Sequence, residues 1–335
     1  MPNRIVRPLL SLALAGALVA AASGCGSSSA SGGKGVSLVA YSTPKEAYAE
    51  LVPAFQKTPA GKGVTFSQSY GASGDQSRAV ASGLPADIVA LSLAPDVDKL
   101  VKAGDVPANW TSGPTHGFVT NSVVTFVVRK GNPKNIKTWA DLVKPGVQVV
   151  EPNPFTSGGA RWNIMAAYGA QIEQGKTPAQ ATAYLGQLFK NVVAQDKSAR
   201  DALQTFSSGK GDVLISYENE AIAAQKKGVS ADYVIPDQTI LIQNPIAVTS
   251  KASNAAKAKA FVDFLESDAG QKIFASKGYR PVKTSLVDKS KFPTPPQLFT
   301  IDKLGGWAFV MKKYFDPASG VVAKIEQANG VSTGG

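Results

Sequence analysis

Runs of apolar residues with strand character alternate with runs of helical character along most of this chain. Two of the strand-to-helix junctions carry glycine-rich turns, at Gly71–Gly74 (GASG) and at Thr156–Arg161 (TSGGAR). Each turn follows a strand-like run and opens a helix-like run. Repeated strand–helix order of this kind predicts an α/β protein built on a parallel sheet.

The two turns also predict a binding site. A helix start leaves its first backbone N–H groups without partners, at the positive end of the helix dipole, and glycine keeps them free of side chains. Such a start holds a small oxyanion without a counter-charge. Tyr217 and the segment Asp196–Ala199 lie at further strand ends or helix starts. Because ligands of open α/β sheets bind beyond the carboxyl ends of the strands, these segments predict one shared anion site.

Hydrophobic periodicity and capping residues predict the remaining elements. Strands are expected at 36–41, 64–70, 86–93, 122–128, 147–150, 212–217, 239–242 and 246–248. Helices are expected at 45–57, 75–82, 95–103, 138–142, 159–168, 178–190, 199–208, 218–227, 255–266 and 269–276. Pro53 is expected to kink or interrupt the first of these helices, because proline lacks the N–H that a helix interior needs.

The first residues have the layout of a secretory signal peptide, assigned here to residues 1–24. Arg4 and Arg7 precede an uncharged apolar stretch, Leu9–Ala22, that is short for a membrane span. Small residues then precede Cys25, and this segment resembles the lipobox of bacterial lipoproteins, in which the cysteine is lipidated as the new N-terminus. The alternative for Cys25 is an ordinary free thiol. Residues 25–35 form a Gly- and Ser-rich sequence typical of a flexible tether.

The basic balance of the chain does not indicate nucleic-acid binding. Without Arg4 and Arg7 the formal charge falls from +11 to +9, and the remaining lysines are scattered along helix-like faces. Nucleic-acid sites need clustered basic residues with aromatic stacking partners. The single cysteine excludes an internal disulfide bond.

Catalytic machinery is missing from the sequence. His116 is the only histidine and lies in an expected loop, so neither a hydrolase triad nor a histidine metal site is indicated. Zinc spacing and a complete nucleotide-binding Gly-x-x-x-x-Gly-Lys-Ser/Thr loop are absent, and no expected strand-to-helix turn carries a Gly-x-Ser-x-Gly elbow. Glu218 and Glu220 fit the first turn of a helix better than an acid–base pair. We therefore expect no catalytic residue, no cofactor and no metal.

Several stretches resemble the sulfate-binding proteins of bacterial ABC importers and the related thiosulfate-binding proteins. The matching stretches are Gly71–Gly74, Val127–Lys134, Pro152–Trp162, Gly211–Glu220, Phe299–Asp302 and Gly305–Trp307. The resemblance covers about residues 36 to 320.

The resemblance implies the type II fold of periplasmic binding proteins, with two α/β lobes joined by crossover strands that act as a hinge. Lobe 1 would comprise residues 36–121 and 247–330, and lobe 2 would comprise residues 122–246. The run 122–128 would carry the chain into the second lobe, and 239–248 would bring it back.

The resemblance also implies the ligand groups. Carried over by position, these are the N–H of Ser73, the hydroxyl of Ser157 and the N–H groups of Gly158, Gly159 and Ala199. Tyr217 stands where the sulfate-binding proteins usually have tryptophan, and Thr43 replaces a usual aspartate. Arg161 and Arg200 match arginines of the family and are expected to support the structure rather than touch the anion.

These features predict an extracytoplasmic, lipid-anchored, monomeric receptor for sulfate that serves the permease of an ABC transporter. Because Tyr217 and Thr43 depart from the family pattern, thiosulfate, molybdate and phosphate stay open as alternatives, as does a secreted enzyme or adhesin. Hydrogen phosphate carries a proton and favours a carboxylate acceptor, for which Asp75 is the candidate. Gly158→Asp is expected to abolish binding and to leave the fold largely intact.

Overall fold

The computed structural model describes residues 35–333. The predicted signal peptide, Cys25 and the tether up to residue 34 lie outside this range. Within residues 35–333, none of the helices combines the length and the apolar character needed to cross a lipid bilayer.

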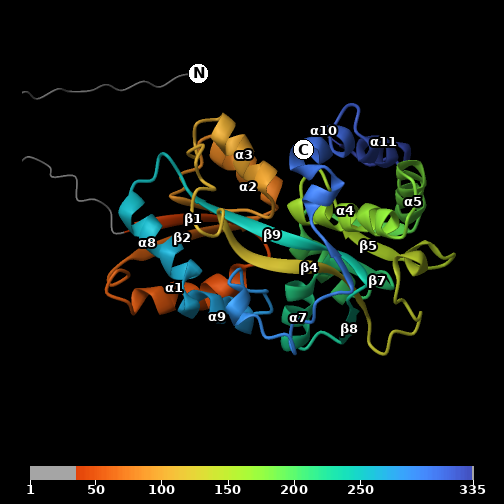
Figure 1. Cartoon of the computed structure of the whole chain (residues 1–335), viewed down its shortest axis with the longest axis horizontal. Coiled ribbons are helices and arrows are strands. Elements are labelled where there is room, and N and C mark those ends of the chain that lie inside the picture. Colours follow the sequence, from red (N-terminus) through yellow and green to blue (C-terminus); the bar gives the residue numbers. More distant parts are fainter. Residues whose placement is uncertain (1–34, 334–335) are drawn as a thin grey trace, which may run out of the picture. The chain divides into compact units, whose positions relative to one another are not determined.

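A central sheet organises the described chain (Figure 1). Its strands follow the order β2-β1-β3-β9-β4-β7-β5-β6, with β10 paired to β9 and β8 paired to β4. The strands are β1 (Gly35–Tyr41), β2 (Thr65–Gly71), β3 (Ile88–Ala90), β4 (Phe118–Arg129), β5 (Val149–Pro152), β6 (Val192–Asp196), β7 (Val213–Tyr217), β8 (Ala231–Val234), β9 (Gln238–Val248) and β10 (Gln297–Phe299).

The sheet is mixed, whereas the repeating strand–helix order predicted a parallel sheet. β1 pairs in parallel with β2 and β3, and β5 pairs in parallel with β6 and β7. The long strands β4 and β9 run antiparallel to each other between these two groups. β4 and β9 include the two runs that were expected to cross between the lobes. Because they are antiparallel, the chain passes from the first group of strands to the second along β4 and returns along β9.

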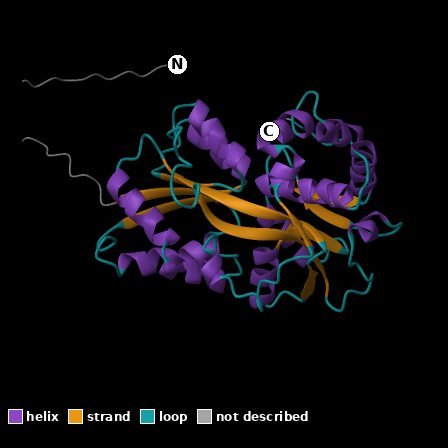
Figure 2. Cartoon of the chain, in the orientation of Figure 1, coloured by secondary structure: helices purple, strands orange, loops and turns teal. Residues whose placement is uncertain are grey.

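Helices cover both faces of the sheet (Figure 2). They are α1 (Lys45–Gln56), α2 (Ser73–Ala81), α3 (Ala94–Lys102), α4 (Gly158–Glu173), α5 (Pro178–Lys190), α6 (Ala199–Ser207), α7 (Glu218–Lys226), α8 (Ala255–Glu266), α9 (Asp268–Ser276), α10 (Gly306–Tyr314) and α11 (Val321–Ala328). Short 3₁₀ turns occupy Trp139–Val143, Thr284–Leu286 and Ile301–Leu304. Pro53 lies inside α1 without interrupting it.

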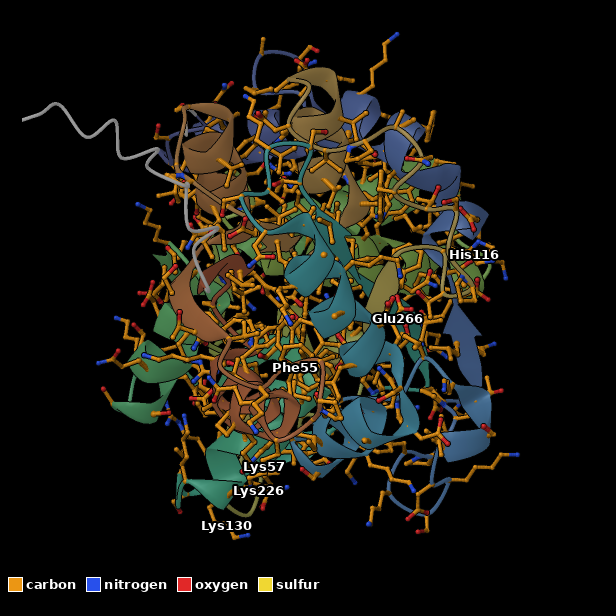
Figure 3. The ribbon with its side chains drawn as sticks, turned by 90° about the vertical axis from the view of Figure 1, so that its left-hand side faces the viewer. Phe55, Lys57, His116, Lys130, Lys226 and Glu266 are labelled. Atoms are coloured by element: carbon orange, nitrogen blue, oxygen red, sulfur yellow. The ribbon has the colours of Figure 1, made fainter. Side chains whose placement is uncertain are left out.

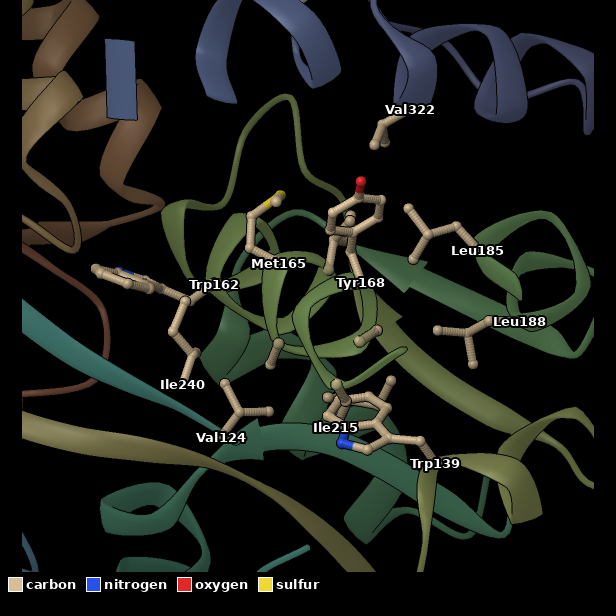
Figure 4. Close-up of a cluster of buried hydrophobic side chains, with 14 of the residues drawn as sticks. Val124, Trp139, Trp162, Met165, Tyr168, Leu185, Leu188, Ile215, Ile240 and Val322 are labelled. Atoms are coloured by element: carbon tan, nitrogen blue, oxygen red, sulfur yellow. The ribbon is translucent and has the colours of Figure 1, made fainter. Parts of the chain in front are cut away.

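The largest apolar cluster lies between α4, α5 and the β4–β7 side of the sheet (Figure 4). Trp139, Trp162 and Tyr168 are buried in this cluster. Val310 of α10 and Val322 of α11 join the same cluster. A separate cluster lies between β1, α1, α8 and α9.

The division into two lobes stays a prediction, and the packing bears on its boundaries. Most apolar residues of the two groups of parallel strands belong to different clusters, although Tyr41 of β1 belongs to the cluster of the β4–β7 side. The C-terminal helices α10 and α11 share the cluster of residues 122–246, although the sequence-based boundaries place them in lobe 1. The irregular segment between α9 and β10 precedes this change of cluster.

Candidate functional site

One small cavity brings all seven predicted ligand-binding residues together. It lies at the carboxyl ends of the strands. Its lining residues are Tyr41, Ser42, Thr43, Ala72, Ser73, Ser92, Ser157, Gly158, Gly159, Ala199 and Tyr217. They come from strand ends on both sides of the β4–β9 pair, as the argument from strand ends predicts.

Helix starts surround this cavity. α2 begins at Ser73, α4 at Gly158 and α6 at Ala199, and Tyr217 is the residue that precedes α7. The first N–H groups of each helix have no partner within that helix. Several positive helix ends therefore face one enclosed volume, which favours an anion over a cation or a neutral ligand.

Local sequence explains where two of these helices begin. The Ser157 hydroxyl oxygen accepts from the N–H of Ala160 at 3.4 Å, and the Ser198 hydroxyl accepts from the N–H of Asp201 at 3.2 Å. Serine caps of this kind fix the first turn and leave the N–H groups of the first two residues free. In α4 these two residues are Gly158 and Gly159.

Both turns require glycine because neighbouring atoms lie too close to leave room for a side chain. The N–H of Gly74 donates to the carbonyl oxygen of Thr156 at 3.0 Å, and a Cβ at Gly74 would lie 2.9 Å from that oxygen. A Cβ at Gly158 would overlap the Leu93 side chain and lie 2.8 Å from the Cβ of Ser92. The two turns thus pack against opposing segments without side chains between them.

Gly159 differs from Gly158. A Cβ there would lie 3.4 Å from both the Ala199 Cβ and the Ser157 Oγ, and 3.7 Å from a ring carbon of Tyr217. All three of these neighbours line the cavity. The hydrogen of Gly159 therefore keeps open a volume that any side chain would occupy.

Tyr217 is almost fully buried, and its hydroxyl lies 2.7 Å from the Ser92 hydroxyl. Three backbone bonds fix Ser92. Its N–H donates to the Ser73 Oγ at 2.9 Å, and its carbonyl accepts from the Trp162 indole and the Asn244 amide, each at 2.9 Å. Burial raises the pKa of the Tyr217 hydroxyl well above its usual value, so it stays protonated and neutral.

Thr43 and Tyr41 complete the cavity on the β1 side. The Thr43 hydroxyl lies 3.2 Å from the Tyr279 hydroxyl, and the Thr43 carbonyl accepts from Arg200 at 2.9 Å. Tyr41 is buried, and its hydroxyl has no hydrogen-bond partner among the described residues. Burial raises the pKa of Tyr41 to about 12.

Charged side chains lie around the cavity rather than in its lining. The Ser73 hydroxyl donates to the buried Asp96 at 2.7 Å, and Arg161 reaches Asp96 at 3.5 Å and the Pro154 carbonyl at 2.7 Å. Arg200 binds Glu46 and Glu220. Although burial opposes it, these carboxylates raise the pKa of Arg200 above its usual value, so the guanidinium stays charged.

Asp75, the candidate acceptor for a protonated phosphate, does not line the cavity. It pairs with Arg78 and with Lys197, the latter at 2.9 Å. None of the described residues that line the cavity carries a carboxylate or a basic group. The arrangement thus offers neutral donors to an anion, with the charged groups one layer further out.

Sequence reasoning missed Tyr41, Ser42 and Ser92 as lining residues. Tyr41 ends β1, and Ser92 follows β3. The argument from strand ends that selected Ser73 and Ser157 applies equally to these positions. Their positions after strands could have indicated them, but neither position has the glycine-rich turn that marked the other sites.

Catalytic and metal chemistry have no visible basis in residues 35–333. That range holds no group of three or more His, Cys, Asp or Glu residues placed to bind a metal ion. His116 is exposed in the loop before β4 and lies at the surface near Glu266 (Figure 3). Lys57, Lys130 and Lys226 project from the periphery, whereas Phe55 lies within (Figure 3).

Comparison with known proteins agrees with this geometry. The profile of the family described as bacterial extracellular solute-binding protein matches residues 36–280. A sulfate-binding protein of Synechococcus elongatus is 44% identical over 96% of both chains. A thiosulfate-binding protein of Pseudomonas aeruginosa is 38% identical over 83% of this chain and 88% of that protein.

The solved structure of the sulfate-binding protein SubI from Mycobacterium tuberculosis has a similar fold. Its TM-score is 0.81 with 43% identity, and the match covers 83% of this chain and 98% of that structure. These relatives are named as binding proteins and not as enzymes, in agreement with the absence of catalytic machinery predicted from the sequence.

Proposed function

Since the chain belongs to the bacterial extracellular solute-binding protein family, we propose that it is a receptor that captures sulfate and delivers it to an ABC transporter. The proposed site is the cavity lined by Ser73, Ser157, Gly158, Gly159, Ala199, Tyr217 and Thr43. Relatives named as sulfate-binding proteins support the choice of ligand. The single observation that carries the proposal is an uncharged cavity surrounded by helix starts.

The chemistry of sulfate fits such a cavity. Sulfate is a fully ionised dianion at neutral pH and needs hydrogen-bond donors alone. Backbone N–H groups at helix starts supply donors that are already oriented, and a buried carboxylate would cost several kcal/mol against the dianion. The Ser157 hydroxyl, which accepts from Ala160, keeps its own hydrogen for the ligand.

Capture would close the two lobes on the anion. The bond from Gly74 to Thr156 and the pairing of Arg200 with Glu46 connect opposite sides of the cavity. Because these contacts form only when both sides meet, a ligand that bridges the sides shifts the protein toward the closed state. A transporter would then receive the loaded form.

Anchoring is part of the proposal. Cys25 follows small residues after an apolar stretch, and lipidation there would hold the receptor at the membrane surface through the tether. Radiolabelled palmitate should enter the wild-type protein and not Cys25→Ser. Equal labelling of both would contradict the anchor and leave the ligand proposal intact.

Thiosulfate is the second candidate, and Tyr217 is the observation that favours it. A tyrosine hydroxyl extends differently from an indole N–H and also accepts hydrogen bonds, which suits a ligand with one unlike atom. A relative named as thiosulfate-binding protein is nearly as similar as the sulfate-binding ones.

Isothermal titration calorimetry of the purified protein tests the proposal. Sulfate is expected to bind with a dissociation constant of about 1 μM or less, and chloride should give no heat. Heat with thiosulfate and none with sulfate would transfer the assignment to thiosulfate. A thermal-shift panel of oxyanions gives an independent reading, because a bound ligand raises apparent stability by mass action.

A further inference from the structure

The cavity has two kinds of polar surface, and the difference bears on which anions it accepts. Resting on the proposed function, we infer that its hydroxyl side, formed by Tyr41, Ser92 and Tyr217, also accepts a hydrogen bond from a tetrahedral oxyanion that carries one proton. Hydrogen phosphate is the simplest member of this class. The expected consequence is a receptor that prefers sulfate but does not exclude the singly protonated anion.

The backbone side of the cavity is donor-only and fixed. The free N–H groups at the starts of α2, α4 and α6 are held by their helices and have no lone pair to offer. Ser157 accepts from Ala160 with one of its two lone pairs and keeps its hydrogen for the ligand. The N–H groups of this side offer no acceptor to a proton on the ligand.

The Ser92–Tyr217 pair, unlike the backbone N–H groups, can both donate and accept hydrogen bonds. Two hydroxyls 2.7 Å apart share one of their two hydrogens, which leaves one hydrogen and several lone pairs directed elsewhere. With Ser92 held by its backbone bonds, reversing the shared bond requires rotation of two O–H groups and no movement of heavy atoms. The pair therefore donates to sulfate or accepts from a protonated anion.

Tyr41 adds a second adaptable group. It is 5% exposed, it lines the same cavity, and its hydroxyl has no partner among the described residues. The hydroxyls of Thr43, Thr120 and Tyr279 lie near it and lower its pKa against the effect of burial, so a ligand group would compete with these neutral neighbours for the Tyr41 hydroxyl. The pKa values of Tyr41 and Tyr217 are raised by burial, so both hydroxyls stay neutral and do not repel a dianion.

Because these acceptors are neutral, the cavity can still bind sulfate. A carboxylate in the cavity would bind the proton of hydrogen phosphate and repel sulfate, and Asp75 lies outside the lining. A hydroxyl rotates to suit either ligand, so it discriminates less strongly in either direction. Selectivity then depends on the cost of reorienting O–H groups rather than on a fixed charge.

A comparison of two ligands tests this without any variant. Hydrogen phosphate and monofluorophosphate have the same charge and similar size, and only the former carries a proton. Calorimetry at about pH 8, where phosphate is mainly the dianion with one proton, is expected to show hydrogen phosphate binding at least as tightly as monofluorophosphate. A donor-only cavity gives the reverse order, which would overturn the inference.

Tyr217→Trp provides the matched protein test, because an indole N–H donates and does not accept. Sulfate affinity is expected to change by less than about tenfold, while the ratio of the phosphate to the sulfate dissociation constant rises about tenfold or more. Tyr41→Phe in the same background raises the ratio further. Tyr184→Phe is the control, since that hydroxyl bonds the Trp139 carbonyl outside the cavity.

The outcomes separate the two proposals. Sulfate binding without detectable phosphate binding at about 1,000 times the sulfate dissociation constant overturns this inference alone. The inference is also overturned if the double variant Tyr217→Trp/Tyr41→Phe has the same ratio of phosphate to sulfate dissociation constants as the wild type. If neither anion binds, both the inference and the proposed function fail.

Discussion

The backbone N–H of Gly74 donates to the carbonyl oxygen of Thr156 at 3.0 Å, and this bond joins the two glycine turns directly. More than 80 residues separate them in the sequence. A Cβ on Gly74 would lie 2.9 Å from the same oxygen, so the contact depends on glycine. The pairing of the turns is thus a property of the backbone, and it places their free N–H groups around one cavity.

Filling the cavity with one methyl group should block the anion. In Gly159→Ala the new Cβ would lie 3.4 Å from the Ala199 Cβ and the Ser157 Oγ, which the fold tolerates but the ligand does not. We expect sulfate affinity to fall by about 10- to 100-fold, the equivalent of about 1–3 kcal/mol of overpacking. Calorimetry measures the affinity, and the unfolding temperature without ligand should change little.

Gly186→Ala is the control for this variant. Gly186 lies within α5, and a Cβ there meets nothing within 4 Å. Alanine should leave sulfate affinity unchanged and raise the unfolding temperature slightly, because alanine has the higher helix propensity. Equal affinities of Gly159→Ala and Gly186→Ala would show that the anion binds elsewhere.

Gly158→Asp should prevent closure rather than unfold the protein. A side chain at Gly158 would overlap Leu93 and Ser92, which follow β3, so we expect the clash to arise when the β3 end and the α4 start come together. Small-angle scattering should show a compaction on adding sulfate for the wild type and none for the variant. A variant that still compacts and binds would contradict the assignment of this turn to the site.

Much of this site could be predicted from local sequence. Glycine turns after strands mark helix starts, and strand ends of an α/β sheet share one edge, so Ser73, Ser157 and Ala199 were expected together. Ser92 also follows a strand, but no glycine turn marks it, and the bonds that fix it are long-range: Tyr217 contacts its hydroxyl, and Trp162 and Asn244 donate to its carbonyl. Local patterns do not encode such long-range partners.

The fold was predictable to a similar degree and for the same reason. Helices with strong periodicity and caps, such as Pro178–Lys190 and Ala255–Glu266, have the predicted bounds. The strand–helix pattern alone did not indicate the antiparallel direction of β4 and β9; only the family resemblance implied it, with one run entering the second lobe and the other returning. Propensity and periodicity carry no information on that crossing.

Acid should weaken the contact between Glu46 and Arg200. Burial acts against it, but bonds from Arg200 and Lys227 lower the pKa of Glu46 from 4.5 to about 2. A carboxylate with a lowered folded-state pKa stabilises the protein above its unfolded value, and this stabilisation is lost as pH falls toward the folded value. The unfolding temperature of the closed, sulfate-saturated protein should therefore fall between about pH 4.5 and pH 2.

Glu46→Gln should remove part of this acid sensitivity, as measured by thermal unfolding at several pH values. Asp263→Asn is the control, because the Asp263–Lys259 pair is exposed, and exposed pairs contribute little to stability. If the two variants have the same pH profile, Glu46 does not contribute as described.

Glu326 should make the protein less stable as the pH rises, the opposite of the pH dependence expected from Glu46. This side chain of α11 is buried, one oxygen accepts from Gln195 at 2.6 Å, and the other has no hydrogen-bond partner among the described residues. Burial raises its pKa from 4.5 to about 7. Because the folded state then binds the proton more tightly than the unfolded state does, stability should decrease as pH rises from about 4.5 to 7.

Glu326→Gln keeps the shape of the side chain and removes the charge that forms in this interval. Its unfolding temperature should match that of the wild type at about pH 4.5 and exceed it at about pH 8, by at least about 2 °C if the gain is about 1 kcal/mol. The neighbouring Glu151, whose pKa burial also raises, accepts from the Asn163 amide with both oxygens. An equal or lower unfolding temperature of the variant at pH 8 would mean that Glu326 is already charged at no cost, and that the C-terminal helix tolerates a carboxylate beneath it.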